Sequence, residues 1–154
     1  MPSSIDARLA ELGITLPDVP APAANYVPFV AAGGLVYVSG QVSRDSGGLI
    51  LGKLGAGVEV KAGAAAARSC GLALVAVLKT ACGGDLDRVA RVVKLTGFVN
   101  SAPDFTDQPA VINGASDLMV EIFGAKGRHA RSAVGMASLP LGVAVEVEGV
   151  FAVA

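Results

Sequence analysis

Two charged residues near the C-terminal end of the chain could do chemistry, and Arg131 is the first. It stands at the entry of a strongly apolar segment, Ser132 to Val153, that we expect to form a β-hairpin. A guanidinium there would be partly desolvated, and its rigid, always-charged fork suits a carboxylate held through two hydrogen bonds. The alternative is an exposed strand-end arginine, or one paired with an acid of its own chain. Periodicity alone favours that alternative.

Glu146 is the second such residue. It lies in the middle of the alternating run Val143-Ala144-Val145-Glu146-Val147-Glu148. Glutamate is depleted in strands, and a carboxylate in an apolar setting needs either a partner or a chemical task. The alternative is a solvent-facing strand position, which Glu148 on the same face supports.

The sequence contains an incomplete phosphate-binding motif. Residues 47–53 read G-x-x-x-x-G-K, but Leu54 stands where a P-loop has the Ser or Thr that binds Mg²⁺. A glycine-rich hairpin loop explains the pattern better.

The single histidine and the two cysteines suggest structural roles. No His, Cys and Asp cluster with metal-ligand spacing surrounds His129, so we expect no metal site. Cys70 and Cys82 fall among apolar residues of one expected helix, about 18 Å apart at the helical rise, too far to form a disulfide.

Composition predicts one domain that associates with copies of itself. The chain has 154 residues, 53% hydrophobic and only 16% charged, which indicates an apolar surface buried in an oligomer. The net charge of −1 and the scattered basic residues argue against nucleic acid. No uninterrupted membrane span and no signal peptide are evident, so a reducing cytoplasm is the expected location.

The coarse pattern predicts the order ββ-α-β-α-ββ after an N-terminal extension. Residues 1–22 form a short helix and a proline-rich linker, and residues 23–154 form the single domain. The expected strands are 26–30, 35–40, a short one at 49–51, 86–99, 132–137 and 143–153, and the expected helices are 59–82 and the segment that starts at Asp107 and Pro109.

An ordered set of motifs in this chain resembles the YjgF/RidA family. The set begins with Val38-Ser39-Gly40-Gln41 and continues through Val92-Val93-Lys94 and Asp104-Phe105 to Arg131-Ser132-Ala133-Val134, Leu139-Pro140 and Val145-Glu146-Val147-Glu148. Tyr26 and Asn113 also sit where the family has a tyrosine and an asparagine. The resemblance covers about residues 24–153.

The resemblance implies an α/β chorismate-mutase-like fold, with a mixed sheet of about six strands backed by two helices. It also implies a homotrimer with a ligand cleft at each subunit interface. Family members hydrolyse enamine and imine intermediates to 2-keto acids and ammonia without metal or organic cofactor. In that scheme Arg131 holds the substrate carboxylate and Glu146 orients or activates water. The residues implied to line the pocket are Tyr26, Ser39, Gly40, Asn113 and Ala133.

Departures from the family pattern keep other functions open. Ala133 replaces a frequent cysteine, His129 replaces a common proline, and the extension and the 43–57 loop are longer, which is typical of a divergent subgroup of about 150 residues. One alternative is a trimer that binds small carboxylates without catalysis. Another is an endoribonuclease, which the net charge and the scarcity of aromatic residues disfavour.

Overall fold

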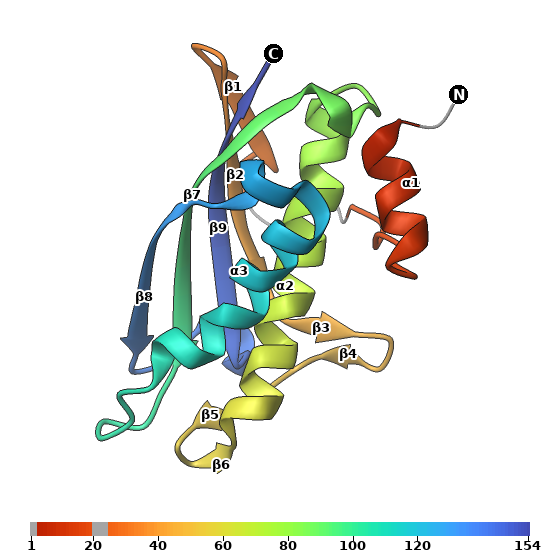
Figure 1. Ribbon diagram of the computed structural model, residues 1–154. Coiled ribbons are helices and arrows are strands. Elements are labelled where there is room, and N and C mark those ends of the chain that lie inside the picture. Colours follow the sequence, from red (N-terminus) through yellow and green to blue (C-terminus); the bar gives the residue numbers. More distant parts are fainter. Residues whose placement is uncertain (1–2, 20–24) are drawn as a thin grey trace.

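The computed structural model describes residues 3–19 and 25–154. Pro20 and Pro22 of the expected linker lie outside the described residues. The architecture is a sheet with two long helices against one face and a short N-terminal helix beside them (Figure 1).

Five strands make up the main sheet within the described part of the chain. Their spatial order is β1-β2-β9-β7-β8, with β7 and β8 parallel and the other neighbours antiparallel. The strands are β1 (Phe29–Ala32), β2 (Leu35–Val42), β7 (Val89–Asn100), β8 (Ala130–Met136) and β9 (Val145–Val153). Gly33 and Gly34, both with positive φ, close the β1–β2 hairpin.

The two long helices form the layer that covers the sheet. α2 (Val60–Ala81) packs on β2 and β9, and α3 (Gln108–Phe123) packs on α2, β7 and β8. The helices approach closely because Gly114 has no side chain, and a Cβ there would overlap the backbone oxygen of Ala64. This close packing fixes α3 over the β7–β8 edge of the sheet.

The order ββ-α-β-α-ββ is confirmed, with two corrections to the strands. The main sheet has five strands rather than six, because the region around 49–51 forms local pairs: β3 (Arg44–Asp45) with β4 (Gly48–Leu49), and β5 (Lys53–Leu54) with β6 (Gly57–Val58). The last two strands are not a hairpin. β7 lies between β8 and β9, since its apolar residues on both faces suit a central position.

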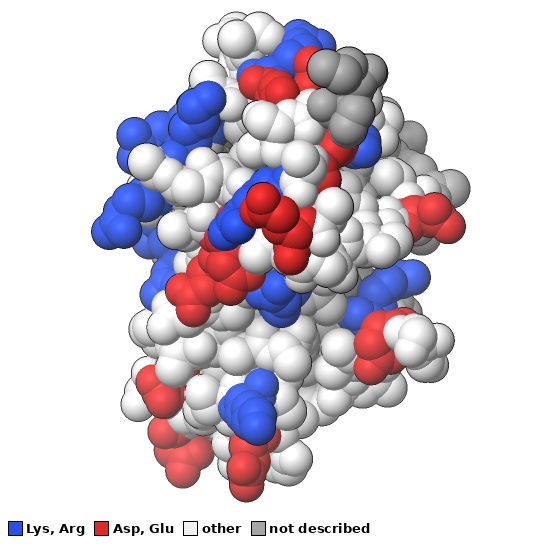
Figure 2. Space-filling view, turned by 45° about the vertical axis from the view of Figure 1, so that its right-hand side comes forward, with Lys and Arg blue, Asp and Glu red and all other residues white. Residues whose placement is uncertain are grey.

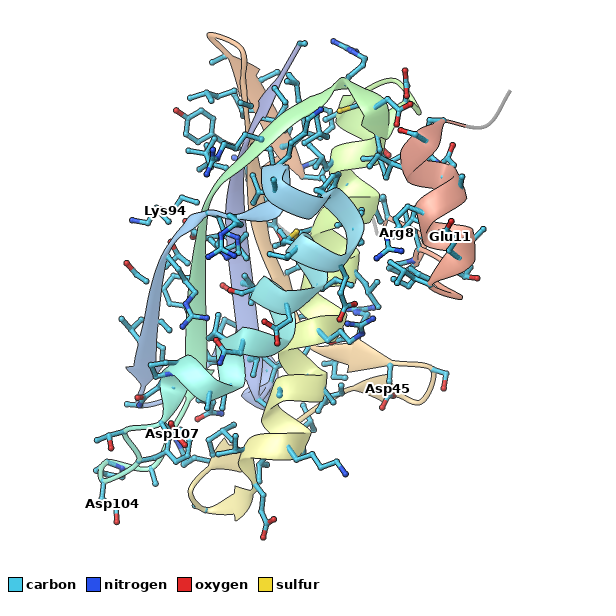
Figure 3. The ribbon with its side chains drawn as sticks, in the orientation of Figure 1. Arg8, Glu11, Asp45, Lys94, Asp104 and Asp107 are labelled. Atoms are coloured by element: carbon cyan, nitrogen blue, oxygen red, sulfur yellow. The ribbon has the colours of Figure 1, made fainter. Side chains whose placement is uncertain are left out.

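The N-terminal helix α1 (Ser4–Glu11) is attached to the body by polar contacts. Ser3 caps it, and the Asp87 carboxylate accepts hydrogen bonds from the backbone N–H groups of Ser4 and Ile5 at 2.9 Å. Lys79 of α2 forms an ion pair with Asp6 at 3.1 Å. In Figure 3, Arg8 and Glu11 lie on the same helix, where they form an ion pair at 3.0 Å.

Helix α2 is long and apolar enough to cross a membrane by length and composition alone. In the structure 56% of its most apolar window is buried, against the sheet and α3. We therefore interpret α2 as the core helix of the domain.

No helix among residues 3–19 and 25–154 lies against the second face of the sheet (Figure 1). Strand register places apolar side chains on this open face, among them Val30, Tyr37 and Val134, which are 52%, 48% and 42% exposed. An apolar sheet face left in water is typical of a surface that a partner covers.

Candidate functional site

Glu146, in strand β9, lies in a hollow beside the part of strand β2 that does not pair with β1. β1 pairs with β2 only as far as Val38, and beyond that point a hollow of about 630 Å³ opens. The hollow is lined by the segment 15–19, by residues 40–42 of β2, by the β3–β4 region and by α2. Apolar and polar side chains line it in similar numbers, and the charged ones are Glu146, Arg44, Asp18 and Asp45. A hollow of this size accommodates a small organic ligand.

The Glu146 carboxyl is half-buried, and no hydrogen bond or ion pair to it is present among the described residues. Burial raises its pKa above the ordinary value of 4.5, and the neighbouring negative charge of Glu148 raises it further. A carboxyl whose pKa is shifted toward neutrality can accept and return a proton during a reaction.

Gly40 makes room for this carboxyl. A bulge between Val38 and Gln41 breaks the pairing of β2 with β9, and a Cβ at Gly40 would lie 2.7 Å from Oε2 of Glu146. The close approach of backbone and carboxyl explains a glycine within a strand. The sequence prediction that groups Gly40 with Glu146 is consistent with this contact.

Tyr26 and Ser39 lie at the same end of the molecule. Tyr26 lines the hollow and is 52% exposed. Ser39 is not among the lining residues, because its hydroxyl donates to the backbone oxygen of Val27 at 2.7 Å. Ser39 therefore fixes the segment that carries Tyr26.

Arg131 belongs to a separate polar cluster at the other edge of the sheet. It lies in β8, half-buried, and its Nη1 donates to Oδ1 of Asn113 at 2.8 Å and to Oγ of Ser116 at 3.2 Å. Asn113 and Ser116 are three residues apart on α3 and so share one helix face. No ion pair involves Arg131 among the described residues, so its charge is oriented but not neutralised.

Ala133 follows Arg131 on the same face of β8. It pairs with Gly97 of β7 and packs against the hydrophobic core, half-buried. A methyl group here adds no reactive atom to the cluster, so the polar chemistry at this edge comes from Arg131 and Asn113.

Arg131 and Glu146 lie on opposite faces of the sheet. Arg131 pairs with Leu95, which is fully buried under the helices, whereas Glu146 pairs with Phe98. Leu95 and Phe98 are three residues apart on one strand, so their side chains point to opposite faces. Within one chain the two charged groups cannot contact the same small molecule.

His129 was expected to be structural and lies next to the arginine cluster. Its Nε2 is 2.9 Å from Oγ of Ser116, and its Nδ1 is 2.6 Å from the backbone oxygen of Gly127. Sequence reasoning did not include Ser116 at all, although its spacing from Asn113 on an expected helix was a usable signal.

The remaining motifs have structural explanations. The Lys53 ammonium donates to Oδ1 of Asn100 at 2.7 Å and to the backbone oxygen of Ala137 at 2.6 Å, so it ties the loop to the sheet. Burial raises the pKa of the thiols of Cys70 and Cys82, which keeps them unreactive. Among residues 3–19 and 25–154 no group of His, Cys, Asp and Glu could hold a metal ion.

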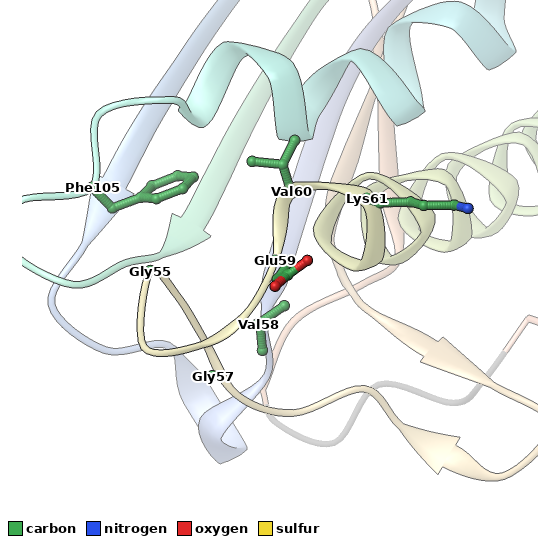
Figure 4. Close-up of a pocket in the computed structure, with 7 residues that line it drawn as sticks. All are labelled: Gly55, Gly57, Val58, Glu59, Val60, Lys61 and Phe105. Carbon is green, nitrogen blue, oxygen red and sulfur yellow. The ribbon is translucent and has the colours of Figure 1, made fainter.

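A second depression, of about 560 Å³, lies at the start of α2 (Figure 4). Gly55 and Gly57 border it, but the Glu59 carboxylate stands at the helix N-terminus and Lys61 points away from Phe105 (Figure 4). A negative charge at this position disfavours a bound phosphate.

Comparison with known proteins identifies the class. A family model described as "YjgF/chorismate_mutase-like, putative endoribonuclease" matches residues 6–152. The chain belongs to this YjgF/RidA family, as the sequence motifs predicted, and its fold is the chorismate-mutase-like fold of that family.

The individual relatives agree with this assignment. The chain is 55% identical over 146 residues to protein TCP17 of Trypanosoma cruzi, covering 94% of this chain and 91% of that protein. It is similar to the crystal structure of Atu1372, of unknown function, from Agrobacterium tumefaciens (47% identity, TM-score 0.90, 97% and 92% of the two chains). It is also similar to a "putative endoribonuclease" from Shewanella oneidensis MR-1 (36% identity, TM-score 0.93, 98% and 100%).

A protein named RidA, from a Psychrobacter species, is more distant. It shares 26% identity with this chain at a TM-score of 0.59, over 88% of this chain and 94% of that one. The contrast with the two structures above agrees with a divergent subgroup within the family.

Proposed function

We propose that this protein hydrolyses enamine or imine intermediates derived from amino acids to 2-keto acids and ammonia. The observation that carries the proposal is the pair of complementary groups described above. One is a guanidinium oriented by uncharged neighbours, and the other is a half-desolvated carboxyl in a hollow. Arg131 would hold the substrate carboxylate, and Glu146 would act as general base and then general acid toward the attacking water and the departing nitrogen.

The chemistry asks for positioning rather than for strong activation. Water adds to the electrophilic imine carbon, and the C–N bond of the resulting carbinolamine then breaks to release ammonia and a keto acid. In this scheme Glu146 accepts a proton from the attacking water and returns it to the departing nitrogen. Holding the substrate by its carboxylate beside that group supplies most of the required advantage.

The proposed site is shared between copies of the chain, in a homotrimer. Because Arg131 and Glu146 lie on opposite sheet faces of one chain, a joint site needs Arg131 of one copy and Glu146 of another. The exposed apolar residues of the open sheet face support such an assembly. Asn113 and Ala133 would then line the site from one copy, and Tyr26 and Gly40 from the other.

The direct test measures keto-acid and ammonia release from a 2-imino acid generated in situ by an amino-acid oxidase. The wild-type protein should accelerate release over the spontaneous rate, and Arg131→Lys should lose most of that acceleration because lysine lacks the planar fork. Keto-acid binding without acceleration would instead support the non-catalytic carboxylate binder.

A second candidate is RNA cleavage, favoured by the family description and by a basic cluster. Arg91, Lys94 and Arg128 are exposed, and Arg91 donates to the backbone oxygen of Arg128 at 2.8 Å. Lys94 projects from the sheet side of the molecule, away from α2 (Figure 3). On the face seen in Figure 2, Lys and Arg gather at the upper left edge, while charges of both signs mix over the centre and the lower part. RNA cleavage that is lost in Lys94→Glu but kept in Arg131→Lys would support this candidate.

A further inference from the structure

The arginine cluster contains a continuous chain of hydrogen bonds that the proposed reaction does not use. It runs from Arg131 Nη1 to Ser116 Oγ at 3.2 Å, from Ser116 Oγ to His129 Nε2 at 2.9 Å, and from His129 Nδ1 to the Gly127 oxygen at 2.6 Å. Three separate elements are joined in this way: strand β8, helix α3 and the turn that precedes β8.

The proton positions along this chain follow from its last member. The Gly127 oxygen can only accept, so Nδ1 of His129 must carry the proton. In the neutral ring Nε2 is then an acceptor, and it receives the Ser116 hydroxyl proton. The Ser116 oxygen is left with lone pairs that face Arg131, which can only donate. Each group thus fixes the orientation of the next one.

We infer that Ser116 and His129 are positioning residues that hold the Arg131 guanidinium ready for a substrate carboxylate. Without them, Asn113 alone would orient the arginine, and Asn113 is exposed. Because all the orienting groups are uncharged, the full positive charge of Arg131 remains for the ligand. This inference rests on the proposed function for its ligand, but the hydrogen-bond chain is a property of the free protein.

Two substitutions of the same residue separate positioning from a local structural tie. The side-chain amide of glutamine reaches the position of Nε2. His129→Gln can therefore keep the hydrogen bond to Ser116, while it loses the hydrogen bond to the Gly127 oxygen. The shorter side chain of asparagine reaches only the position of Nδ1. His129→Asn therefore keeps the hydrogen bond to the Gly127 oxygen and loses the hydrogen bond to Ser116. Ser116→Ala breaks the chain in its middle, and Ser138→Ala, in the loop after β8, is the matched control.

The affinity test uses 2-oxobutanoate as the probe in calorimetry, together with the KM of the imino acid. Ser116→Ala and His129→Asn should weaken binding and raise KM by about three- to tenfold, the effect of one lost hydrogen bond. kcat should change much less, because the carboxylate is held equally in the ground and transition states. His129→Gln should stay close to wild type. Loss in His129→Gln with wild-type behaviour in His129→Asn would overturn the inference.

A measurement without ligand tests the positioning role independently of the proposed function. If the protein bound no keto acid, that result would refute only the proposed function. His129 is the only histidine, so its ¹⁵N signals are assigned without ambiguity. We expect a proton on Nδ1, and guanidinium protons of Arg131 that exchange slowly in wild type and His129→Gln but faster in Ser116→Ala and His129→Asn. Equal exchange in all four proteins would refute the positioning role. Thermal melts of each variant verify that it is folded.

Discussion

The sheet carries Arg131 on its edge strand β8 and Glu146 on its central strand β9, next to the part of β2 that β1 leaves unpaired, and it holds the two charges in opposite ways. At the β8 edge, Arg131 is bound by neutral side chains of α3. At the β2 edge, Glu146 has a hollow of about 630 Å³ beside it but no partner among the described residues. One edge offers an oriented charge and the other offers space. In the proposed homotrimer, Arg131 of one copy would complete the hollow that holds Glu146 of another.

This difference also has an energetic side. A guanidinium with well-made hydrogen bonds is stable as a free group, whereas the burial of a carboxyl disfavours its charged form. The raised pKa of Glu146 therefore marks a group whose charge is costly until a partner or a proton relieves it. The predictions below test the division of roles between these two edges.

Removal of the Arg131 side chain should have the largest effect. Arg131→Ala takes away one partner of a charged pair with the substrate, a loss of about 2–5 kcal/mol, or roughly 30- to 5000-fold in kcat/KM. Steady-state kinetics on an in-situ imino acid measures this loss. Lys61→Ala, which removes an exposed cation at the start of α2 that does not line the Glu146 hollow, is the control and should cost far less. Equal losses would show that Arg131 has no special role.

Mixing two inactive variants tests whether Arg131 of one copy and Glu146 of another copy form one active site. Arg131→Ala and Glu146→Gln chains, co-expressed in equal amounts, should recover about a quarter of wild-type activity, because a cyclic assembly takes each residue of a shared site from a different chain. Size-exclusion chromatography with light scattering should show a trimer. No recovery in a mixed trimer would mean that each site belongs to one chain.

Gly40→Ala should reduce turnover at the Glu146 edge without unfolding the protein. The added Cβ would lie 2.7 Å from Oε2 of Glu146, so the flexible carboxyl must move from its place. We expect about a tenfold fall in kcat, less than the roughly 10²–10⁴-fold that loss of a general base costs, because the carboxyl is displaced and not removed. Gly47→Ala, where the nearest atom is Oδ1 of Asp45 at 3.2 Å in the exposed hairpin (Figure 3), is the control. A fall in melting temperature that matches the loss of activity would contradict a local effect.

Much of this arrangement could be predicted from the sequence, because it follows from local pattern. Helix α2 lies within a residue of the expected range 59–82, and α3 begins directly after Asp107, where a helix start was expected. Arg131 and Glu146 were noticeable because charged residues are unusual in apolar strands. These features need no knowledge of how the strands are ordered in space.

The placement of Arg131 and Glu146 on opposite sheet faces could not be predicted in this way. The pattern of β8 and β9 is that of a hairpin, and only the insertion of β7 between them shows that they are not paired. The contact of Ser116 with His129 likewise depends on how α3 packs on the edge of the sheet. Long-range packing decides both, and no local signal reports it.

Glu148→Gln should give the smallest and most diagnostic change. Its negative charge helps to raise the pKa of Glu146, so its removal should lower that pKa toward the ordinary value of 4.5. If Glu146 acts as a base, kcat/KM falls as the pH drops below the Glu146 pKa, and in Glu148→Gln this limb should move to lower pH. Glu148 is exposed, so its charge is screened by salt, and the difference between wild type and variant should shrink at high ionic strength. A limb that stays in place would mean that the pH dependence comes from another group, and the carboxyl in the hollow would then have no part in proton transfer.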